Sequence, residues 1–206
     1  MAKMIRKFYD KNELGFSIIW IIAYCILASI GDNISDELGI AKVITLPILL
    51  VLSLILFLFI KRNNLTEKYG FCKADIAASK MLFYIPVSIL LTANMWHGFR
   101  VKMSLLETIL YILSMFCVGF LEELIFRGFL FKAMSRDSIK WAVVVSSVTF
   151  GLGHIINLLN GSGMGVAENL VQIFFAVLIG FLYVIIFWHG GSLWPCVISH
   201  GVLNSL

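Results

Sequence analysis

The stretch CVGFLEELIFRGFLFKAMSR, residues 117–136, is apolar over most of its length but carries Glu122, Glu123 and Arg127 near its centre. The rest of the chain is similarly apolar: 60% of its 206 residues are hydrophobic, 14% are charged and the mean hydropathy is +0.96. A typical soluble domain is about half apolar and about a quarter charged. The composition therefore predicts a single integral membrane domain over residues 1–206, with no room for a second, soluble domain.

Apolar runs that are long enough to cross, or nearly cross, a bilayer recur along the chain. Crossing as helices allows each run to satisfy its own backbone hydrogen bonds in lipid. We therefore expect an all-α, polytopic membrane helical bundle with about seven (roughly six to eight) transmembrane helices. The expected segments are 14–30, 43–60, 81–97, 104–133, 139–159, 166–188 and 192–206. Gly190 and Gly191 should end the sixth segment, and Pro195 suits the first turn of the seventh.

The 16 lysines and arginines are distributed unevenly over the expected loops. With the amino terminus in the cytoplasm, Lys42, Arg100 and Lys102 fall outside, Arg127 lies within a span, and the other twelve of the 16 are cytoplasmic. This distribution follows the positive-inside rule. It explains the net charge of +4 without a nucleic-acid partner, so we expect a protein of the lipid bilayer with a cytoplasmic amino terminus.

The cysteines lack the spacing of a zinc site, and three of them lie in apolar runs; they are Cys25, Cys72, Cys117 and Cys196. A disulfide framework is typical of small secreted domains, which this chain does not resemble in composition. We therefore expect the four cysteines to be reduced packing residues.

Charged side chains near the bilayer centre cost roughly 2.5–3.5 kcal/mol on insertion scales, so each needs a partner or a function. Glu123 and Arg127 are four residues apart on one helical face, in the favourable acid-first order. Glu122 points about 100° away from them and lacks that partner. We expect Glu123 and Arg127 to be supporting residues and Glu122 to be available for chemistry.

Two histidines and an asparagine lie in later apolar runs. His154 follows FGLG, and His200 precedes Asn204 by four residues, which places His200 and Asn204 on one helical face. At about 1.5 Å per residue, Glu122 lies roughly 16–18 Å from the turn near residue 134, and His154 lies roughly 20 Å beyond the turn near residue 140. His200 and Asn204 lie roughly 12 and 18 Å beyond residue 192. Three helices should therefore bring Glu122, His154, His200 and Asn204 to a similar depth.

These residue types suit hydrolysis of an acyl bond, a peptide bond in particular. A carboxylate desolvated among apolar residues can act as the general base that takes a proton from water. One histidine can hold that water, and the second histidine with the asparagine can donate to a developing oxyanion. Alternatively, Glu122, His154 and His200 could bind a divalent metal such as zinc, which acidifies the water. The residues alone leave both chemistries open.

Three motifs resemble those of the CAAX-protease and bacteriocin-processing (CPBP, or Abi) family of intramembrane proteases. EELIFRG (122–128) is similar to its EExxxR motif, FGLGH (150–154) to FxxxH, and HGVLN (200–204) to HxxxN. The run GFLYVIIFWHGGSLWPCVISHGVLN (180–204) is also similar to the closing segment of the family. The resemblance covers residues 105–206, which we expect to form the catalytic core.

This resemblance implies that Glu122 and His154 activate water while His200 and Asn204 stabilise the oxyanion, with Glu123, Arg127 and Phe150 in support. It implies a peptide or membrane-protein substrate, a bacterial cell membrane, and CAAX-like processing, bacteriocin maturation or self-immunity. We favour glutamate-activated water without a metal. A non-enzymatic immunity or scaffold protein that binds a peptide is the main alternative, and a small transporter is a third, because buried Glu and His residues also form proton relays. The sequence does not determine the oligomeric state.

Overall fold

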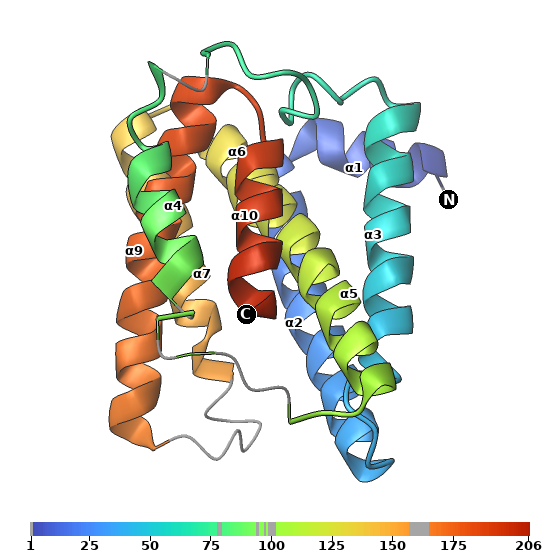
Figure 1. Ribbon diagram of the computed structural model, residues 1–206. Helices are drawn as coiled ribbons and strands as arrows, with labels where there is room; N and C mark the ends of the chain where they lie inside the picture. Colours follow the sequence, from blue (N-terminus) through green and yellow to red (C-terminus); the bar gives the residue numbers. More distant parts are fainter. Residues whose placement is uncertain (1, 78–79, 94, 97, 99–101, 157–164) are drawn as a thin grey trace.

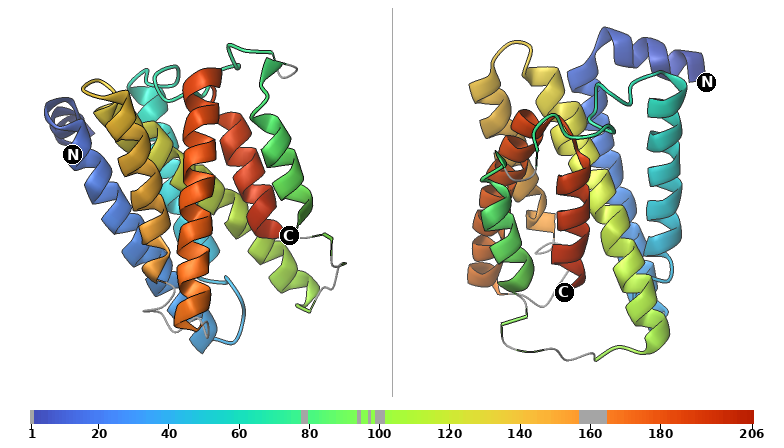
Figure 2. Two further views of the ribbon diagram at one scale, coloured as in Figure 1. Left: turned by 90° about the vertical axis from the view of Figure 1, so that its left-hand side faces the viewer. Right: turned by 45° about the horizontal axis from the view of Figure 1, so that its top comes forward.

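The computed structural model describes residues 2–77, 80–93, 95–96, 98, 102–156 and 165–206 (Figure 1). Arg100 and parts of the expected segments 81–97 and 139–159 lie outside these residues. Within them, the regular structure is helical and no strand occurs, which confirms the all-α class. The long helices stand side by side as a bundle in every view (Figure 2).

Each expected segment contains a helix. In chain order the helices are α1 (Ala2–Lys11), α2 (Glu13–Glu37), α3 (Thr45–Arg62), α4 (Tyr84–Ala93), α5 (Leu105–Glu122), the π-helix η2 (Glu123–Phe131), α6 (Lys132–Met134), α7 (Ile139–Gly153), α9 (Val166–Gly190) and α10 (Trp194–Ser205). α5, η2 and α6 follow one another without a break. α1 was not among the expected elements, because the first expected segment begins after the basic residues of the amino terminus.

The expected count of seven transmembrane helices is not confirmed. Among the described residues, four helical stretches are long and apolar enough to cross a membrane: α2, α3, Leu105–Met134 and α9. α7 is a shorter apolar helix of 15 residues, about 22 Å long at 1.5 Å per residue. α4 and α10 have 10 and 12 residues, so they too are shorter than the ~30 Å hydrocarbon core. Within the described residues, each of these three helices is therefore shorter than the apolar run that predicted it.

Local signals in the sequence set the ends of the helices around the site. Ser104 and Glu107 form a capping box at the start of α5, where each side chain accepts from the backbone N–H of the other. Gly191 ends α9 in the left-handed conformation at φ 69°, which glycine adopts without a Cβ penalty. Pro195 lies in the first turn of α10, where no intrahelical N–H bond is needed. The predicted boundary between these two helices is confirmed.

The nine residues after Glu122 form the π-helix η2 instead of continuing the α-helix. All nine are buried, and η2 contacts α2, α7 and α9. π-helices are rare and often occur at functional sites, because the wider turn changes where side chains point. Glu123 and Arg127 therefore lie on a non-standard helix in the middle of the bundle, directly after Glu122 at the end of α5.

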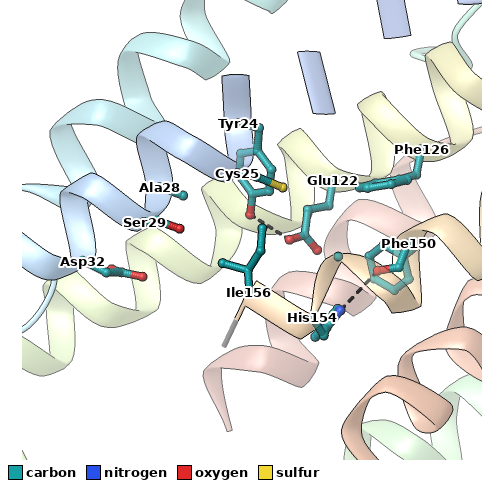
Figure 3. A pocket seen from close by; sticks show the side chains of 11 residues that line it. Tyr24, Cys25, Ala28, Ser29, Asp32, Glu122, Phe126, Phe150, His154 and Ile156 are labelled. Atoms are coloured by element: carbon teal, nitrogen blue, oxygen red, sulfur yellow. Dashed lines mark hydrogen bonds between the residues drawn. The ribbon is translucent and has the colours of Figure 1, made fainter. Parts of the chain in front are cut away.

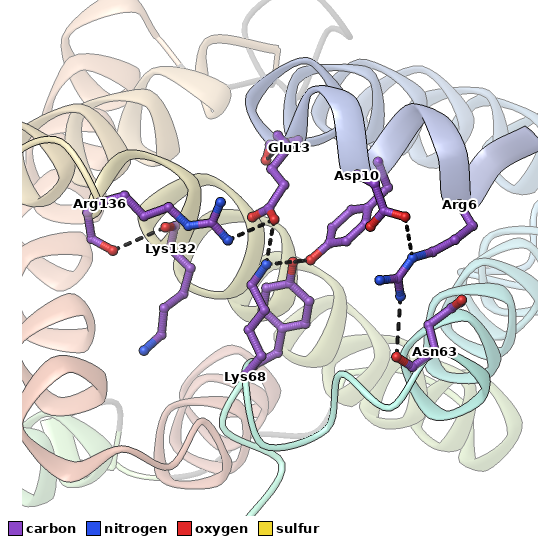
Figure 4. Close-up of polar contacts among 11 residues, drawn as sticks. Arg6, Asp10, Glu13, Asn63, Lys68, Lys132 and Arg136 are labelled. Atoms are coloured by element: carbon purple, nitrogen blue, oxygen red, sulfur yellow. Dashed lines mark hydrogen bonds and ion pairs between the residues drawn. The ribbon is translucent and has the colours of Figure 1, made fainter.

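One end of the bundle is rich in basic residues, and we call it the basic end; it includes Arg6, Lys68, Lys132 and Arg136 (Figure 4). Glu13, the first residue of α2, accepts hydrogen bonds from Lys68 Nζ at 2.7 Å and from Arg136 Nη2 at 2.8 Å. The Tyr9 and Tyr69 hydroxyls bond each other nearby, and burial together with this bond raises the pKa of Tyr69. These contacts join α1, α2, the segment after α3 and the turn after α6.

Candidate active site

The ion pair expected within the EELIFRG stretch is present and buried. Glu123 and Arg127 have no exposed surface, and Arg127 Nη1 lies 3.2 Å from Glu123 Oε1. The same Glu123 oxygen lies 2.7 Å from His200 Nδ1 of α10. A carboxylate only accepts hydrogen bonds, so Nδ1 carries a proton and donates it to Glu123. Glu123 therefore has two partners, whereas the sequence predicted only Arg127.

Aromatic rings surround this buried charge. The Arg127 guanidinium lies 4.1 Å from the centre of the Phe150 ring and 5.6 Å from that of Tyr183. Such cation–π contacts stabilise a cation that has little access to water. Phe150 also makes edge contacts with His154 and His200, with centroids 5.3 and 5.8 Å away. Phe150, a predicted supporting residue, thus touches three of the other predicted site residues.

Glu122 takes a different position from Glu123, as expected. Its side chain is 15% exposed and lines a cavity of about 130 Å³ between α2, α5 and the end of α7 (Figure 3). One carboxylate oxygen, Oε1, accepts a hydrogen bond of 2.7 Å from the Tyr24 hydroxyl. The other oxygen, Oε2, lies 3.5 Å from His200 Nε2. A polar cavity needs only roughly 10–15 Å³ of such space to hold one water molecule, so this cavity is large enough to admit water beside Glu122.

His154 lines the same cavity as Glu122 (Figure 3). It lies directly after the last residue of α7 rather than inside a longer helix, so the expected segment 139–159 is not one continuous helix in its described part. Its Nδ1 lies 3.2 Å from the carbonyl oxygen of Phe150. Donation from Nδ1 to this carbonyl leaves Nε2 as the acceptor in the neutral ring. His154 can therefore accept a proton or a hydrogen bond from a water molecule in the cavity.

The structure brings three of the four predicted catalytic residues together. Glu122 and His154 line the cavity, and His200 lies behind Glu122, only 4% exposed. Asn204 lies one turn after His200 on α10 and is partly exposed. It is not among the described residues that line the cavity. Its proposed role therefore rests on its spacing from His200.

A close approach of two helices places His200 beside the glutamates. A Cβ added to Gly119 of α5 would lie 2.9 Å from both Gly201 N and Val197 O of α10. A Cβ added to Gly201 would lie 2.7 Å from the Phe116 ring. Small residues at such contacts allow the backbones of neighbouring helices to come together. The glycine after His200 and the glycine three residues before Glu122 therefore set the distance between the histidine and both carboxylates.

α2 was not among the elements that the sequence predicted to form the site. Five residues of this helix line the cavity, and they follow one helical face: Tyr24, Cys25, Ala28, Ser29 and Asp32. All but Ala28 carry polar or polarisable atoms, although α2 is otherwise strongly apolar. The spacing of these polar residues on one face of an apolar span was the sequence signal that could have predicted a role for α2 in the cavity wall.

Neither the cysteines nor the predicted metal ligands form a cluster of metal-binding type among the described residues. All four cysteines are free; Cys196 is buried and the other three are partly buried. Among the described residues, no group of three or more His, Cys, Asp or Glu side chains is arranged to hold a metal ion. His200 uses Nδ1 for Glu123, and its Nε2 is 3.5 Å from Glu122. We derive no step through a metal.

Residues 103–206 match a family model described as type II CAAX prenyl endopeptidase Rce1-like. No curated protein and no solved structure matches the chain. The matched region begins just before α5 and contains every residue of the three motifs. α2, which forms the opposite wall of the cavity, lies outside it.

Proposed function

Because the chain belongs to the Rce1-like type II CAAX prenyl endopeptidase family, we propose that it is an intramembrane endopeptidase in which Glu122 activates water. The observation that carries this proposal is the geometry of Glu122. Its carboxylate belongs to an apolar helical stretch and lines a cavity that is large enough to hold water, opposite Tyr24 and together with His154. A carboxylate held in such a place suits general-base catalysis.

In the proposed reaction, Glu122 accepts a proton from a water molecule that His154 helps to hold. The resulting hydroxide attacks the carbonyl carbon of the scissile peptide bond and forms a tetrahedral oxyanion. Asn204 and His200 are the proposed donors to this oxyanion, and His200 donates from Nε2 with a proton on both ring nitrogens; such stabilisation is often worth several kcal/mol. Glu122 then returns its proton to the leaving nitrogen as the C–N bond breaks, so protons and electrons balance.

Glu123 and Arg127 have supporting roles in this proposal. Glu123 orients the His200 ring through Nδ1, which directs Nε2 towards Glu122. Arg127 balances the buried charge of Glu123 and rests on Phe150. In the proposed mechanism, Glu123 thus affects Glu122 by orienting the His200 ring that lies between them.

The substrate class follows from the family description. A CAAX prenyl endopeptidase acts on a protein that ends in a prenylated Cys-aliphatic-aliphatic-X sequence. This favours CAAX-type processing, rather than bacteriocin maturation or self-immunity, as the first activity to test. We further propose that the basic end faces the cytoplasm, since basic residues concentrate on that side of membranes.

A direct test compares the wild type with Glu122→Gln and His154→Ala, each purified in lipid nanodiscs at matched amounts. The probe is a fluorescence-quenched peptide ending in a farnesylated Cys-aliphatic-aliphatic-X sequence. We expect both variants to lose about 10²-fold or more in kcat/KM, the range for removal of a general base. Glu107→Gln, in the same continuous helical stretch but in its capping box, is the matched control and should cleave normally.

Full activity in Glu122→Gln would overturn the proposed mechanism. Binding of the peptide without cleavage by every variant, including the wild type, would favour the non-enzymatic scaffold instead. Metal dependence needs its own measurement: exhaustive chelation should leave the wild-type rate unchanged, and loss of activity that zinc restores would refute metal-free water activation.

A further inference from the structure

One face of α2 forms the wall of the cavity opposite Glu122 of the first motif and Phe150 and His154 of the second (Figure 3). This face precedes residues 103–206, so the family model does not cover it. On this face, the Tyr24 hydroxyl makes a direct hydrogen bond to Glu122. The ring is 7% exposed and belongs to the buried hydrophobic core of the bundle, and α2 packs against η2. The position of its hydroxyl is therefore fixed by packing.

We propose that Tyr24 is a positioning residue that fixes the carboxylate of Glu122 for water activation. The inference rests on the proposed function, because it assigns Tyr24 to the same reaction. Tyr24 donates to Oε1 at 2.7 Å from α2, while His200 lies 3.5 Å from Oε2 on α10. The two oxygens of Glu122 thus face partners on two different helices.

The physical reason for such a contact is the freedom of a glutamate side chain. Glu122 is partly exposed to a cavity, and each rotamer of its side chain aims the carboxylate at a different point. A hydrogen bond to an ionised carboxylate is stronger than one between two neutral groups. The bond from Tyr24 can therefore favour one rotamer of Glu122 over the others. A base that is misplaced by about 1 Å can lose about 10²-fold in rate. Tyr24 therefore contributes to turnover without itself exchanging a proton with the substrate.

The contact also gives the region before residue 103 a defined part in the site. The other polar residues of this face, including Ser29 and Asp32, extend the cavity wall towards the C-terminal end of α2. The Tyr24 hydroxyl, nearer the middle of α2, donates its hydrogen bond to the Glu122 carboxylate. The contribution of α2 to the chemistry is therefore assigned to Tyr24.

The test is Tyr24→Phe, which keeps the buried ring and removes only the hydroxyl. With the farnesylated quenched peptide as the probe, we expect kcat to fall about tenfold while KM stays within about twofold, because the lost contact acts on the base and not on substrate binding. The thermal midpoint should stay close to that of the wild type. Tyr84→Phe removes a hydroxyl from α4, outside the cavity, and should leave both constants unchanged.

A double-mutant cycle separates an effect through Glu122 from a general effect on folding. Glu122→Asp shortens the side chain by one methylene and withdraws the carboxylate from the Tyr24 hydroxyl. If Tyr24 acts through Glu122, Tyr24→Phe should cost less in the Glu122→Asp background than in the wild type. Multiplicative losses in the double variant, an unchanged kcat in Tyr24→Phe, or a raised KM with unchanged kcat would each overturn the inference. Loss of activity in Glu122→Gln beside full activity in Tyr24→Phe refutes this inference alone, whereas full activity in Glu122→Gln refutes the proposed function as well.

Discussion

We expect the buried ion pair of Glu123 and Arg127 to contribute strongly to the stability of the folded protein. Both side chains are fully buried, and Arg127 Nη1 lies 3.2 Å from Glu123 Oε1. Arg127→Met fills a similar volume but leaves Glu123 buried with His200 as its remaining described partner. Breaking a buried pair in this way costs about 3–5 kcal/mol, because one charge stays without compensation. At about 2–4 °C per kcal/mol for a chain of this size, the thermal midpoint should fall by about 6–20 °C.

The double variant Glu123→Gln/Arg127→Met tests whether charge is the cause. Removing both charges should recover most of the lost stability, since replacement of a whole buried ion pair by neutral groups is often close to neutral. Activity should not recover with it, because the neutral amide introduced at position 123 would no longer offer His200 a carboxylate. We therefore expect a protein that melts nearly as the wild type does but cleaves slowly.

Thermal unfolding followed by tryptophan fluorescence in detergent measures these midpoints. The matched control is Arg136→Met, which removes an arginine that also pairs with a glutamate but is 61% exposed. An exposed pair contributes about 0–1 kcal/mol, so the control should melt within about 4 °C of the wild type. Equal midpoints for Arg127→Met and Arg136→Met, or a double variant no more stable than Arg127→Met, would refute the argument from buried charge.

Three other predictions follow from contacts around the site. Gly119→Ala places a Cβ against the backbone at Gly201, so it should separate α5 from α10, cost about 1–3 kcal/mol and slow cleavage, all measurable by melting and kinetics. Normal activity in this variant would mean that the approach of the two helices does not position His200. Cys25 lines the cavity, so Cys25→Phe should fill part of it and slow cleavage while Cys25→Ser cleaves normally, and normal cleavage by Cys25→Phe would mean that the reaction does not use this cavity. Glu13→Gln should lower the thermal midpoint by about 2–4 °C at low salt, because it removes the ion pairs with Lys68 and Arg136. The loss should be smaller at about 1 M NaCl, where salt screens these partly exposed pairs. A loss that does not depend on salt would argue against ion pairing.

The helices themselves were largely predictable from the sequence. Apolar runs located each of them except α1, and the residues Gly190, Gly191 and Pro195 predicted the boundary between α9 and α10. The number of full spans was not predictable in the same way. An apolar run measures how much chain prefers lipid, whereas the length of a helix also depends on where the regular hydrogen-bond pattern is interrupted, as it is by a turn at His154 after α7.

The site was predictable where it depends on local spacing. The pairing of Glu123 with Arg127 follows from four residues on one helical face, and the structure contains it. The contact from Tyr24 to Glu122 joins residues 98 apart in the chain, and that from His200 to Glu123 joins residues 77 apart. Such contacts depend on the packing of helices against one another, which no local pattern specifies. The packing of helices likewise decides that His200 Nδ1 bonds Glu123 and not the adjacent Glu122.

The π-helix η2 has a consequence for which changes the EELIFRG stretch can accept. Each residue of a helix turns the chain by a set angle, about 100° in an α-helix and less in the wider π-helix, so deletion of one residue within η2 would rotate all later side chains relative to Glu122. Phe129 and Phe131, which are buried on η2, would then face new neighbours, and the turn that carries Arg136 to Glu13 would move. Substitutions here alter one side chain each, whereas an insertion or a deletion alters the register of the whole bundle beyond it. We therefore expect related chains that keep this π-helix to have the same number of residues between the two glutamates and the basic residues that follow η2. The apolar residues in between can differ.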